Sequence, residues 1–414
     1  MFGDLSPHYR PLAPQTVGDY VRTRSELNSI FQPTDEIEAV EVGDGNLNLV
    51  FKVWAKDDPK RTVVLKQALP YVRLVGDSWP LPPDRARIEA QALEIHGRLV
   101  PQHTPKVYFY DPDMYLTGMQ NLTEHIIMRK GMIQGFKYPH FAEHIGLFMA
   151  RTLGNTSDLV LDYRTKKLEV ARFISPELCK ITEDLVFTEP YRYIERNAFH
   201  KEIEPQVLAL QADEALRVEV AMMKEKFMTQ AQALVHGDLH TGSIMINQTE
   251  TIVIDPEFAF YGPMGFDVGA VIANLLLSYA SHEVRSPDPE KRADFRRYLT
   301  DTIIQLWHVF EREFQPIWNQ VDPINMPKGY QQNYMLNILQ DAAGMGACKM
   351  MRRVIGLAGV EDIRGIENVD ERSVAASLAL NIAQTLIMNR KHFGTIEELV
   401  EAAVGCKPTY PWKS

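Results

Sequence analysis

The first third of the chain carries the alternating hydrophobic pattern of β-strands. Three runs rich in β-branched and aromatic residues, separated by turn residues, are Ile37–Val42, Leu49–Ala55 and Thr62–Gln67. Short connections between such runs predict an antiparallel meander. Two further short strands are predicted at Lys106–Asp111 and Met114–Gln120. The pattern thus predicts a small sheet in this part of the chain.

Helical periodicity appears between these strands and predominates after them. The segment DRARIEAQALEIHGRL has apolar residues at helical spacing and Asp84 as a candidate N-cap. After Asn121 nearly all of the chain has a helical pattern, apart from one predicted hairpin near residues 244–255. We therefore predict an α+β, bilobal fold, with a strand-rich lobe over residues 1–120, a hinge near Asn121 and a larger helical lobe over residues 121–414.

Composition places the chain among globular proteins. Of its 414 residues 45% are hydrophobic and 24% are charged, and 44 basic against 54 acidic residues give a net charge of −10. This sign disfavours nucleic acid and anionic membranes as partners. The most apolar stretch, Val268–Ala280, is interrupted by Asn274 and is shorter than the roughly 20 residues that span a bilayer. Three widely spaced cysteines favour a reducing, cytoplasmic location.

The segment LVHGDLHTGSIMINQTETIVIDPEF carries the chemistry that the sequence suggests. It predicts a polar loop, a strand, a turn and a second strand, an arrangement that would bring Asp238 and Asp255 to the same rim. Phosphoryl transfer needs a carboxylate to orient the attacking hydroxyl and others to hold Mg²⁺ on the phosphates. Asp238 is the candidate base, and Asp255 and Glu257, separated by Pro256, are the candidate metal ligands. A lone loop Asp is more often a turn or helix cap, but the combination favours catalysis.

Two histidines and a further aspartate flank the candidate base. His236 and His240 have the spacing of a helical zinc site, but they lie in a glycine-containing loop, which favours a structural role in which His236 props the loop. Asp267 opens an apolar stretch and is predicted either to accept the backbone N–H groups of the HGD loop or to cap a helix.

A lysine in the predicted sheet is the candidate phosphate-binding cation. Lys66 lies in the apolar run TVVLKQ, where a charge requires a counter-ion or a site, and Glu89 in the following helix is its predicted partner. The alternative is a solvated lysine on an edge strand. The loop GDGNLN is a weaker candidate for phosphate contact, because glycines between strands usually only form turns.

At these residues the sequence resembles the methylthioribose kinases, which belong with aminoglycoside and choline kinases to the protein-kinase-like superfamily. The resemblance rests on HGDLHTGS, DPEFAFYGPMGFDVG, GDGNLN, LKQALPY, GDSWPL followed by DRARIE, and MMRRVIGLA. Ser243 departs from the Asn that other small-molecule kinases of this fold have at that place. The resemblance implies ATP and Mg²⁺, a homodimer, and phosphorylation of methylthioribose at its anomeric hydroxyl, with Asp238 at the sugar.

The same resemblance implies a set of nucleotide contacts. Asn48 and Lys66 would contact ATP, and Asp255 to Glu257 would lie at the phosphates. The segment Gln120, Asn121 and Leu122 would hold the adenine. The family often has acidic residues where this chain has Gln120 and Asn121, a departure of little consequence if backbone groups read the adenine.

An arginine pair follows in AAGMGACKMMRRVIGLA, a helical pattern that is apolar around most of its surface. Arg352 and Arg353 would be costly there unless anions meet them, and guanidinium forks suit sugar hydroxyls or a transferring phosphoryl. Because consecutive helical side chains diverge by about 100°, we expect one of the two to contact the substrate. The alternative is a solvated edge of a surface helix.

Three other functions remain open from the sequence. One is a kinase of the same fold acting on another acceptor, such as choline, homoserine or an aminoglycoside, which the arginine pair disfavours because a cationic acceptor needs an acidic pocket. A second is a nucleotide-binding pseudokinase, although no catalytic carboxylate is missing. The third, a helical scaffold, leaves the carboxylate grouping unexplained.

Overall fold

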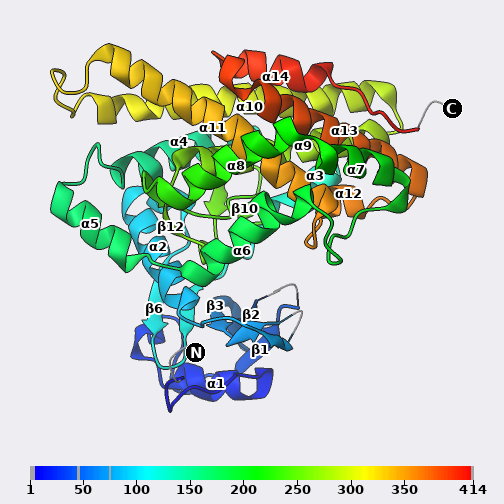
Figure 1. Cartoon of the computed structure of the whole chain (residues 1–414). Helices are drawn as coiled ribbons and strands as arrows, with labels where there is room; N and C mark the ends of the chain where they lie inside the picture. The colour runs from blue at the N-terminus through cyan, green and yellow to red at the C-terminus, as the bar shows by residue number, and fades with distance from the viewer. Residues whose placement is uncertain (1–4, 44–46, 74–75, 412–414) are drawn as a thin grey trace. The chain divides into compact units, whose positions relative to one another are not determined.

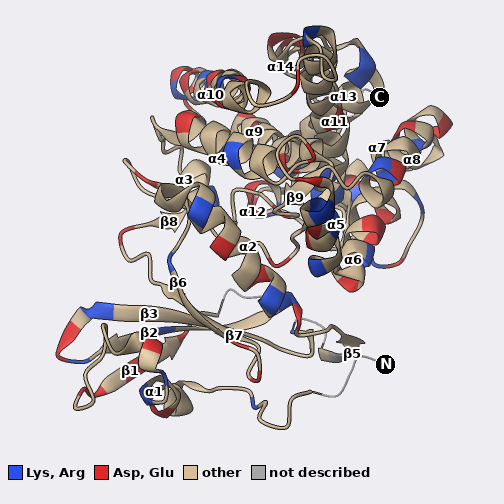
Figure 2. Ribbon diagram, turned by 90° about the vertical axis from the view of Figure 1, so that its left-hand side faces the viewer, with Lys and Arg blue, Asp and Glu red and all other residues tan. Residues whose placement is uncertain are grey.

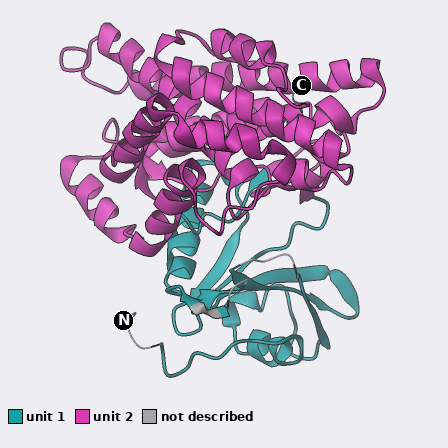
Figure 3. Cartoon of the chain, turned by 45° about the vertical axis from the view of Figure 1, so that its right-hand side comes forward, with its two compact units in different colours: residues 1–125, 252–259 teal, residues 126–251, 260–414 magenta. Residues whose placement is uncertain are grey.

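The chain folds into two compact units, which are coloured separately in Figure 3. The structure is a computed structural model that describes residues 5–43, 47–73 and 76–411. Unit 1 comprises Met1–His125 and Ile252–Ala259, and unit 2 comprises Ile126–Thr251 and Phe260–Ser414. The sequence places the division after residue 120, whereas unit 1 runs through His125 and also takes in a short segment from the second half of the chain.

Unit 1 is built on a small antiparallel sheet (Figure 1). Its elements in chain order are α1 (Pro14–Arg22), η1 (Ser25–Leu27), β1 (Ile37–Glu41), β2 (Asn48–Ala55), β3 (Asp58–Ala68), β4 (Tyr71–Val72), β5 (Gly76–Pro80), α2 (Arg85–Leu99), η2 (Pro101–His103), β6 (Val107–Asp111) and β7 (Leu116–Gln120). Five of the strands form one sheet in the order β1-β2-β3-β7-β6, and β4 pairs separately with β5. The predicted meander and the two later strands are therefore confirmed, whereas α1 and the β4–β5 pair were not predicted.

Alternation along β3 decides which side chains enter the core of unit 1. Val63 and Leu65 are fully buried on one face, in a cluster that includes Val17 and Val21 of α1. Because neighbouring residues of a strand point to opposite faces, Lys66 lies on the other face. Helix α2 packs against β3, β6 and β7. The apolar pattern of β3 thus directs Lys66 away from the apolar core.

The start of α2 differs from the sequence prediction. Asp84 precedes the helix, but its backbone is already helical and its side chain makes no capping hydrogen bond. Its carboxylate instead accepts hydrogen bonds from the Arg87 guanidinium at 2.7 and 2.9 Å. Asp84 therefore occupies the predicted N-cap position, but its side chain does not cap the helix, because the Arg87 guanidinium binds the same oxygens.

Unit 2 is mostly helical. Its elements are β8 (Ile126–Ile127), α3 (Met128–Ile133), α4 (Phe141–Asn155), α5 (Tyr163–Arg172), α6 (Pro176–Phe187), η3 (Glu189–Tyr191), η4 (Lys201–Ile203), α7 (Glu204–Ala212), α8 (Glu214–Thr229), β9 (Ala233–Val235), β10 (Ile244–Ile246), β12 (Phe260–Gly262), α9 (Met264–Arg285), α10 (Pro289–Trp318), α11 (Lys328–Ile355), α12 (Glu361–Arg364), α13 (Val369–Asn389), η5 (Arg390–His392) and α14 (Ile396–Gly405). Strand β11 (Thr251–Val253) carries the chain from unit 2 into unit 1.

The hairpin predicted near residues 244–255 is present at its turn. The N–H of Asn247 donates to the carbonyl of Glu250 at 3.1 Å, and the Asn247 side chain accepts the N–H of Thr249 and Glu250. A second strand pair, β9 with β12, has Phe260 opposite Val235 and was not predicted. It brings the start of the HGD loop beside the segment that leads into α9.

Helix α9 is the core of unit 2 and packs against α10, α11 and α13. By length and composition it is apolar enough to cross a membrane, but its apolar window is 100% buried inside the unit, as expected of a core helix. The helix extends beyond the apolar stretch Val268–Ala280 at both ends, and Asn274 is buried within it. Figure 2 shows acidic and basic residues interspersed on outer helices such as α10.

Helices α9 and α11 approach each other at two glycines. A Cβ on Gly346 would lie 2.6 Å from the backbone oxygen of Gly269, and a Cβ on Gly269 would lie 2.5 Å from the backbone oxygen of Ala342. Real Cβ atoms do not approach backbone so closely, so each helix needs glycine here. This contact places the second turn of α9 beside the second half of α11.

We expect Gly346→Ala to lower the free energy of unfolding by about 1–3 kcal/mol, because the clash is with backbone and only a shift of the helices relieves it. Gly329→Ala on the same helix is the matched control, since a Cβ there meets nothing within 4 Å. The control should be neutral or stabilising by up to about 1 kcal/mol. Urea denaturation of both variants measures the difference. Equal unfolding midpoints for Gly346→Ala and Gly329→Ala would show that the helices can move apart at Gly346 at no cost in stability.

Candidate active site

Lys66 is held between two carboxylates in unit 1. Its Nζ donates to Glu89 Oε1 of α2 at 2.9 Å, as predicted, and also to Asp255 Oδ1. Burial would lower the pKa of Lys66, but Asp255 and Glu89 raise it above its ordinary value. Burial also raises the pKa of Glu89, yet an ammonium at 2.9 Å makes the ionised pair the favoured state. The solvated-lysine alternative is wrong, because only 12% of the side chain is exposed.

A second set of contacts fixes Glu257. Its Oε2 accepts a hydrogen bond from Asn48 Nδ2 at 2.9 Å and lies 3.3 Å from Arg85 Nε. Arg85, which is buried, also donates to Asn48 Oδ1 at 3.0 Å and to the carbonyls of Leu47 and Leu69. Arg85 therefore ties together the start of β2, the segment before α2 and the metal-ligand candidate.

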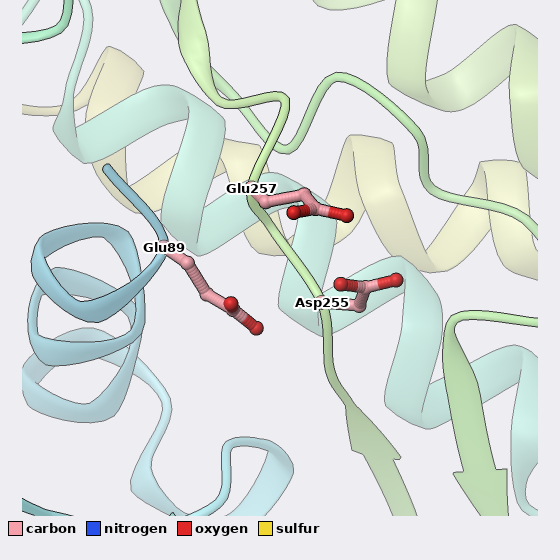
Figure 4. Close-up of side chains that lie close together, drawn as sticks. All are labelled: Glu89, Asp255 and Glu257. Carbon is pink, nitrogen blue, oxygen red and sulfur yellow. The ribbon is translucent and has the colours of Figure 1, made fainter. Parts of the chain in front are cut away.

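Three carboxylates converge in this unit, as Figure 4 shows. Oxygens of Glu89, Asp255 and Glu257 lie within 4.8 Å of one another. Asp255 has a φ of +69°, a left-handed conformation that aspartate tolerates better than most residues, and Pro256 follows it. Asp255 and Glu257 project from one short segment, while Glu89 comes from α2 and is held by Lys66. Clustered carboxylate oxygens are the donors that Mg²⁺ prefers, so the residues fit such an ion.

The other nucleotide candidates lie at the end of β7 and before β2. The N–H of Gln120 donates to the Lys106 carbonyl at 2.8 Å, and Asn121 Nδ2 donates to Thr62 Oγ1 at 3.0 Å. The Gln120 N–H and the Asn121 side chain are thus hydrogen-bonded within unit 1. Of the loop GDGNLN, residues 44–46 lie outside the described residues, so the predicted phosphate contact there has no structural description.

The HGD loop of unit 2 is held by Asp267. The carboxylate accepts the N–H of His236 at 2.6 Å and the N–H of Gly237 at 3.1 Å, as the sequence predicted. The helix-cap alternative is wrong, because α9 begins at Met264 after Pro263 and Asp267 already lies within it. His236 Nδ1 in turn accepts the N–H of Asp238 at 3.3 Å, which agrees with a structural role for this histidine.

Asp238 is surrounded by hydrogen-bond donors and cations. His240 Nε2 lies 3.3 Å from Oδ2, Lys349 Nζ lies 3.1 Å from Oδ1, and Arg353 Nη2 lies 3.8 Å from Oδ2. Burial would raise the pKa of Asp238, but His240, Lys349 and Arg353 hold it well below its ordinary value. Burial lowers the pKa of His240 to about 3, so this imidazole is neutral near pH 7 and acts on Asp238 as a hydrogen-bond donor. The cations therefore keep Asp238 ionised. Ser243, at the position of the expected Asn, donates to the Asp238 carbonyl at 3.0 Å.

The arginine pair lies on α11 as predicted, together with a lysine that sequence reasoning missed. Arg353 donates to the Ala358 carbonyl at 3.3 Å and faces Asp238, with 11% of its side chain exposed. The Nε of Arg352 is buried without a hydrogen-bond partner among the described residues. Lys349 lies three and four residues before them, so the three cations share one side of the helix.

A further cation, Arg129 of α3, was also not predicted. Its Nε lies 3.2 Å from Asp362 Oδ2 of α12, and its Nη2 donates to Asn274 Oδ1 at 3.1 Å. Burial raises the pKa of Asp362, against the opposing effect of Arg129. Asn274, which interrupts the apolar stretch of α9, therefore serves as a polar partner for this arginine.

The missed residues differ in the signal that they offered. Lys349 stands in the same apolar helix as the arginine pair, so the argument from buried charge applied to it equally. Arg85 lies in DRARIE, a motif noted only as a resemblance. For Arg129 and Asp362 the sequence shows no motif, and only the packing of α3 and α12 brings them together.

Comparisons with known proteins agree with this chemistry. Residues 38–301 match the model of the phosphotransferase enzyme family, which supports the predicted protein-kinase-like fold. The chain is 44% identical over 393 residues to the methylthioribose kinase of Geobacillus kaustophilus, covering 94% of this chain and 96% of the relative. It is 42% identical over 428 residues to that of Escherichia coli, covering 97% and 99%.

A solved choline kinase structure from Cryptosporidium parvum is similar at 13% identity and a TM-score of 0.48, covering 97% of this chain and 99% of that one. The fold assignment rests on the family match and on the sheet and helices described above. Identity above 40% over nearly the full length of both chains decides between the acceptor classes that the sequence left open. The chain is a small-molecule kinase and belongs to the methylthioribose kinase family.

Proposed function

We propose that the protein transfers the γ-phosphoryl of ATP to the anomeric hydroxyl of 5-methylthioribose, giving 5-methylthioribose 1-phosphate and ADP in methionine salvage. The observation that carries the proposal is Asp238, an ionised carboxylate facing Lys349 and Arg353 in a chain of this family. The bond between the γ-phosphorus and the bridging oxygen of ATP breaks, and a bond from the sugar oxygen to phosphorus forms.

Asp238 would accept the hydroxyl proton and orient the sugar oxygen. Its low pKa makes it a weak base, but an anomeric hydroxyl is more acidic than an ordinary alcohol, so orientation outweighs proton removal. Arg352 would bind the sugar or the transferred phosphoryl, since its buried Nε has no described partner. Nearby cations offset charge that develops on the phosphoryl oxygens.

The residues of unit 1 would bind the nucleotide. Mg²⁺, held by Asp255 and Glu257, would neutralise phosphate charge. Lys66, oriented by Glu89, would contact the phosphates, and Asn48 and Arg85 would fix Glu257. Gln120, Asn121 and Leu122 would hold the adenine through main-chain groups, and Pro256 limits backbone rotation between the metal ligands.

Two further proposals follow from the family resemblance and the composition. The protein would act as a cytoplasmic homodimer, without nucleic-acid or membrane partners. The net charge of −10 disfavours nucleic-acid and membrane partners, and the three free cysteines support a reducing, cytoplasmic location. Light scattering on a size-exclusion column tests the dimer, and a monomer mass at micromolar concentration would count against it.

The substrate proposal predicts that purified protein with ATP and Mg²⁺ converts methylthioribose to a product phosphorylated at C1. Phosphorus NMR follows the reaction, with choline, homoserine and an aminoglycoside as competing acceptors. Asp238→Asn is the control for the site: it should lose turnover while still binding ATP. Phosphorylation of another acceptor in preference to methylthioribose would contradict the proposal.

The metal proposal predicts that Asp255→Asn and Glu257→Gln each raise the Mg²⁺ concentration needed for half-maximal turnover by about tenfold or more, a loss of roughly 1.4 kcal/mol in metal binding. Asparagine is used at position 255 because it tolerates the left-handed backbone. Asp113→Ala, at an exposed position of the same unit, is the control. Unchanged Mg²⁺ dependence in both test variants would remove these residues from the metal site.

The arginine proposal predicts that Arg352→Ala lowers kcat/KM for methylthioribose by roughly thirtyfold to a thousandfold, because a charge-assisted contact in a desolvated site is worth about 2–4 kcal/mol. If fork geometry matters, Arg352→Lys will be nearly as damaging. The same substitutions at Arg353 should cost less, since the side chains diverge. Arg312→Ala, at an exposed arginine, is the control. If the alanine and lysine variants at both arginines fold and keep kcat/KM within about threefold of wild type, the sugar is recognised by other residues.

A further inference from the structure

Lys349 is a buried ammonium whose described hydrogen bonds both go to the HGD loop. Its Nζ donates to Asp238 Oδ1 at 3.1 Å and to the Gly237 carbonyl at 3.4 Å, and it lies 4.2 Å from the ring centroid of Phe266. Only 7% of the side chain is exposed. Lysine is rarely buried unless it is paired, so these contacts account for its position. Both hydrogen-bond acceptors of its ammonium belong to the loop that carries Asp238.

The two oxygens of Asp238 have different partners. Oδ1 is bound by Lys349, while Oδ2 faces His240 at 3.3 Å and Arg353 at 3.8 Å. A carboxylate turns easily about its last bond, because that torsion is broad. A rigidly held donor on Oδ1 removes this freedom and determines where the Oδ2 lone pairs point.

The backbone of the same loop is gripped from two helices. Asp267 of α9 accepts the N–H of Gly237, and Lys349 of α11 donates to the carbonyl of the same residue. Gly237 has a φ of +83°, a conformation that favours glycine. The close contact of α9 and α11 at Gly269 and Gly346 holds these two side chains in place.

We propose that Lys349 is a positioning residue for phosphoryl transfer, which fixes the loop and the carboxylate of Asp238 so that one oxygen faces the acceptor hydroxyl. This inference rests on the proposed role of Asp238. A buried ion pair often contributes little to stability compared with an apolar pair of similar size. Orientation of the reacting groups is where this pair has its effect.

The charged groups around Asp238 determine the direction of the pH effect. They are His240 in the loop, Lys349, Arg352 and Arg353 of α11, Arg129 of α3, Asp267 of α9 and Asp362 of α12. Burial lowers the pKa of Lys349, opposed by Asp238, and the still lower pKa of Asp238 leaves the proton on the lysine. Without Lys349 the pKa of Asp238 rises, and activity that needs the carboxylate is lost at a higher pH.

The test compares Lys349→Met with Lys349→Arg and with the control Lys226→Met. Lys226 of α8 donates to Asp341 of α11 at 2.6 and 2.9 Å, so the control removes a different lysine–aspartate pair, one that also involves α11. For each variant kcat, KM for ATP and for the acceptor, the pH profile of kcat/KM and the melting temperature are measured.

We expect Lys349→Met to lower kcat by at least about tenfold, to leave KM for ATP within about twofold, and to move the acid limb of the profile to higher pH. Lys349→Arg keeps the positive charge, so the acid limb should return to its wild-type position. The planar guanidinium cannot reproduce the contacts of the compact ammonium, so kcat should be only partly restored. Lys226→Met should change the melting temperature alone.

A folded Lys349→Met variant with kcat within threefold of wild type and an unchanged acid limb would overturn the proposal. If this variant does not fold, Lys349→Gln replaces it with the same expected changes and the same overturning result. If neither folds, a wild-type kcat in Lys349→Arg overturns the proposal, and a reduced kcat with unchanged KM for ATP supports it.

The acceptor panel in the wild type separates this inference from the proposed function. If another acceptor is phosphorylated, the substrate proposal fails but the Lys349 comparison runs on that acceptor. If none is phosphorylated, the titration of the labelled Asp238 carboxyl by carbon NMR, assigned with Asp238→Asn, still reports the effect of Lys349. An identical titration in wild type and Lys349→Met would overturn the electrostatic part of the inference.

Discussion

The contact of α9 with α11 at Gly269 and Gly346 is the constraint on which the candidate site residues of unit 2 depend. Two helices that touch backbone to backbone cannot slide or separate without losing packing along their length. Asp267 projects from one helix and Lys349 from the other, and both bind Gly237. The packing of the core helices thus determines the geometry of the HGD loop, because side chains of both helices bind its backbone.

Buried charge is arranged by the same principle in both units. In unit 1 an ammonium, Lys66, lies between Glu89 and Asp255, and in unit 2 a carboxylate, Asp238, lies among donors from α11 and its own loop. A charge removed from water requires partners, and those partners hold it in one orientation. The groups of the candidate site are therefore held in fixed orientations by the protein itself, which is the arrangement that the proposed electrostatic catalysis needs.

Much of the fold followed from local pattern, because strands and helices are read from periodicities that few residues establish. The meander β1–β3, helix α2 and the helical second half were predicted, together with the hairpin turn at residues 247–250. The pair β9–β12 was missed because its strands have three residues each, too few to show alternation. Asp84 lies at the predicted N-cap position, but its side chain makes no capping hydrogen bond because a neighbouring arginine binds the carboxylate.

For the candidate site, the sequence by itself determined the groups that lie in contiguous motifs: Asp238 in HGD, Asp255 with Glu257 in DPE, and the arginine pair. The short spacing within each motif limits how far apart its members can lie, so chemistry can be inferred from each motif. The tertiary structure alone decided which distant charges meet them. Arg85 contacts Glu257, and Lys349 contacts Asp238, only because the folded chain brings these distant residues together. A buried ion's partner is set by the packing of whole helices, which no local pattern encodes.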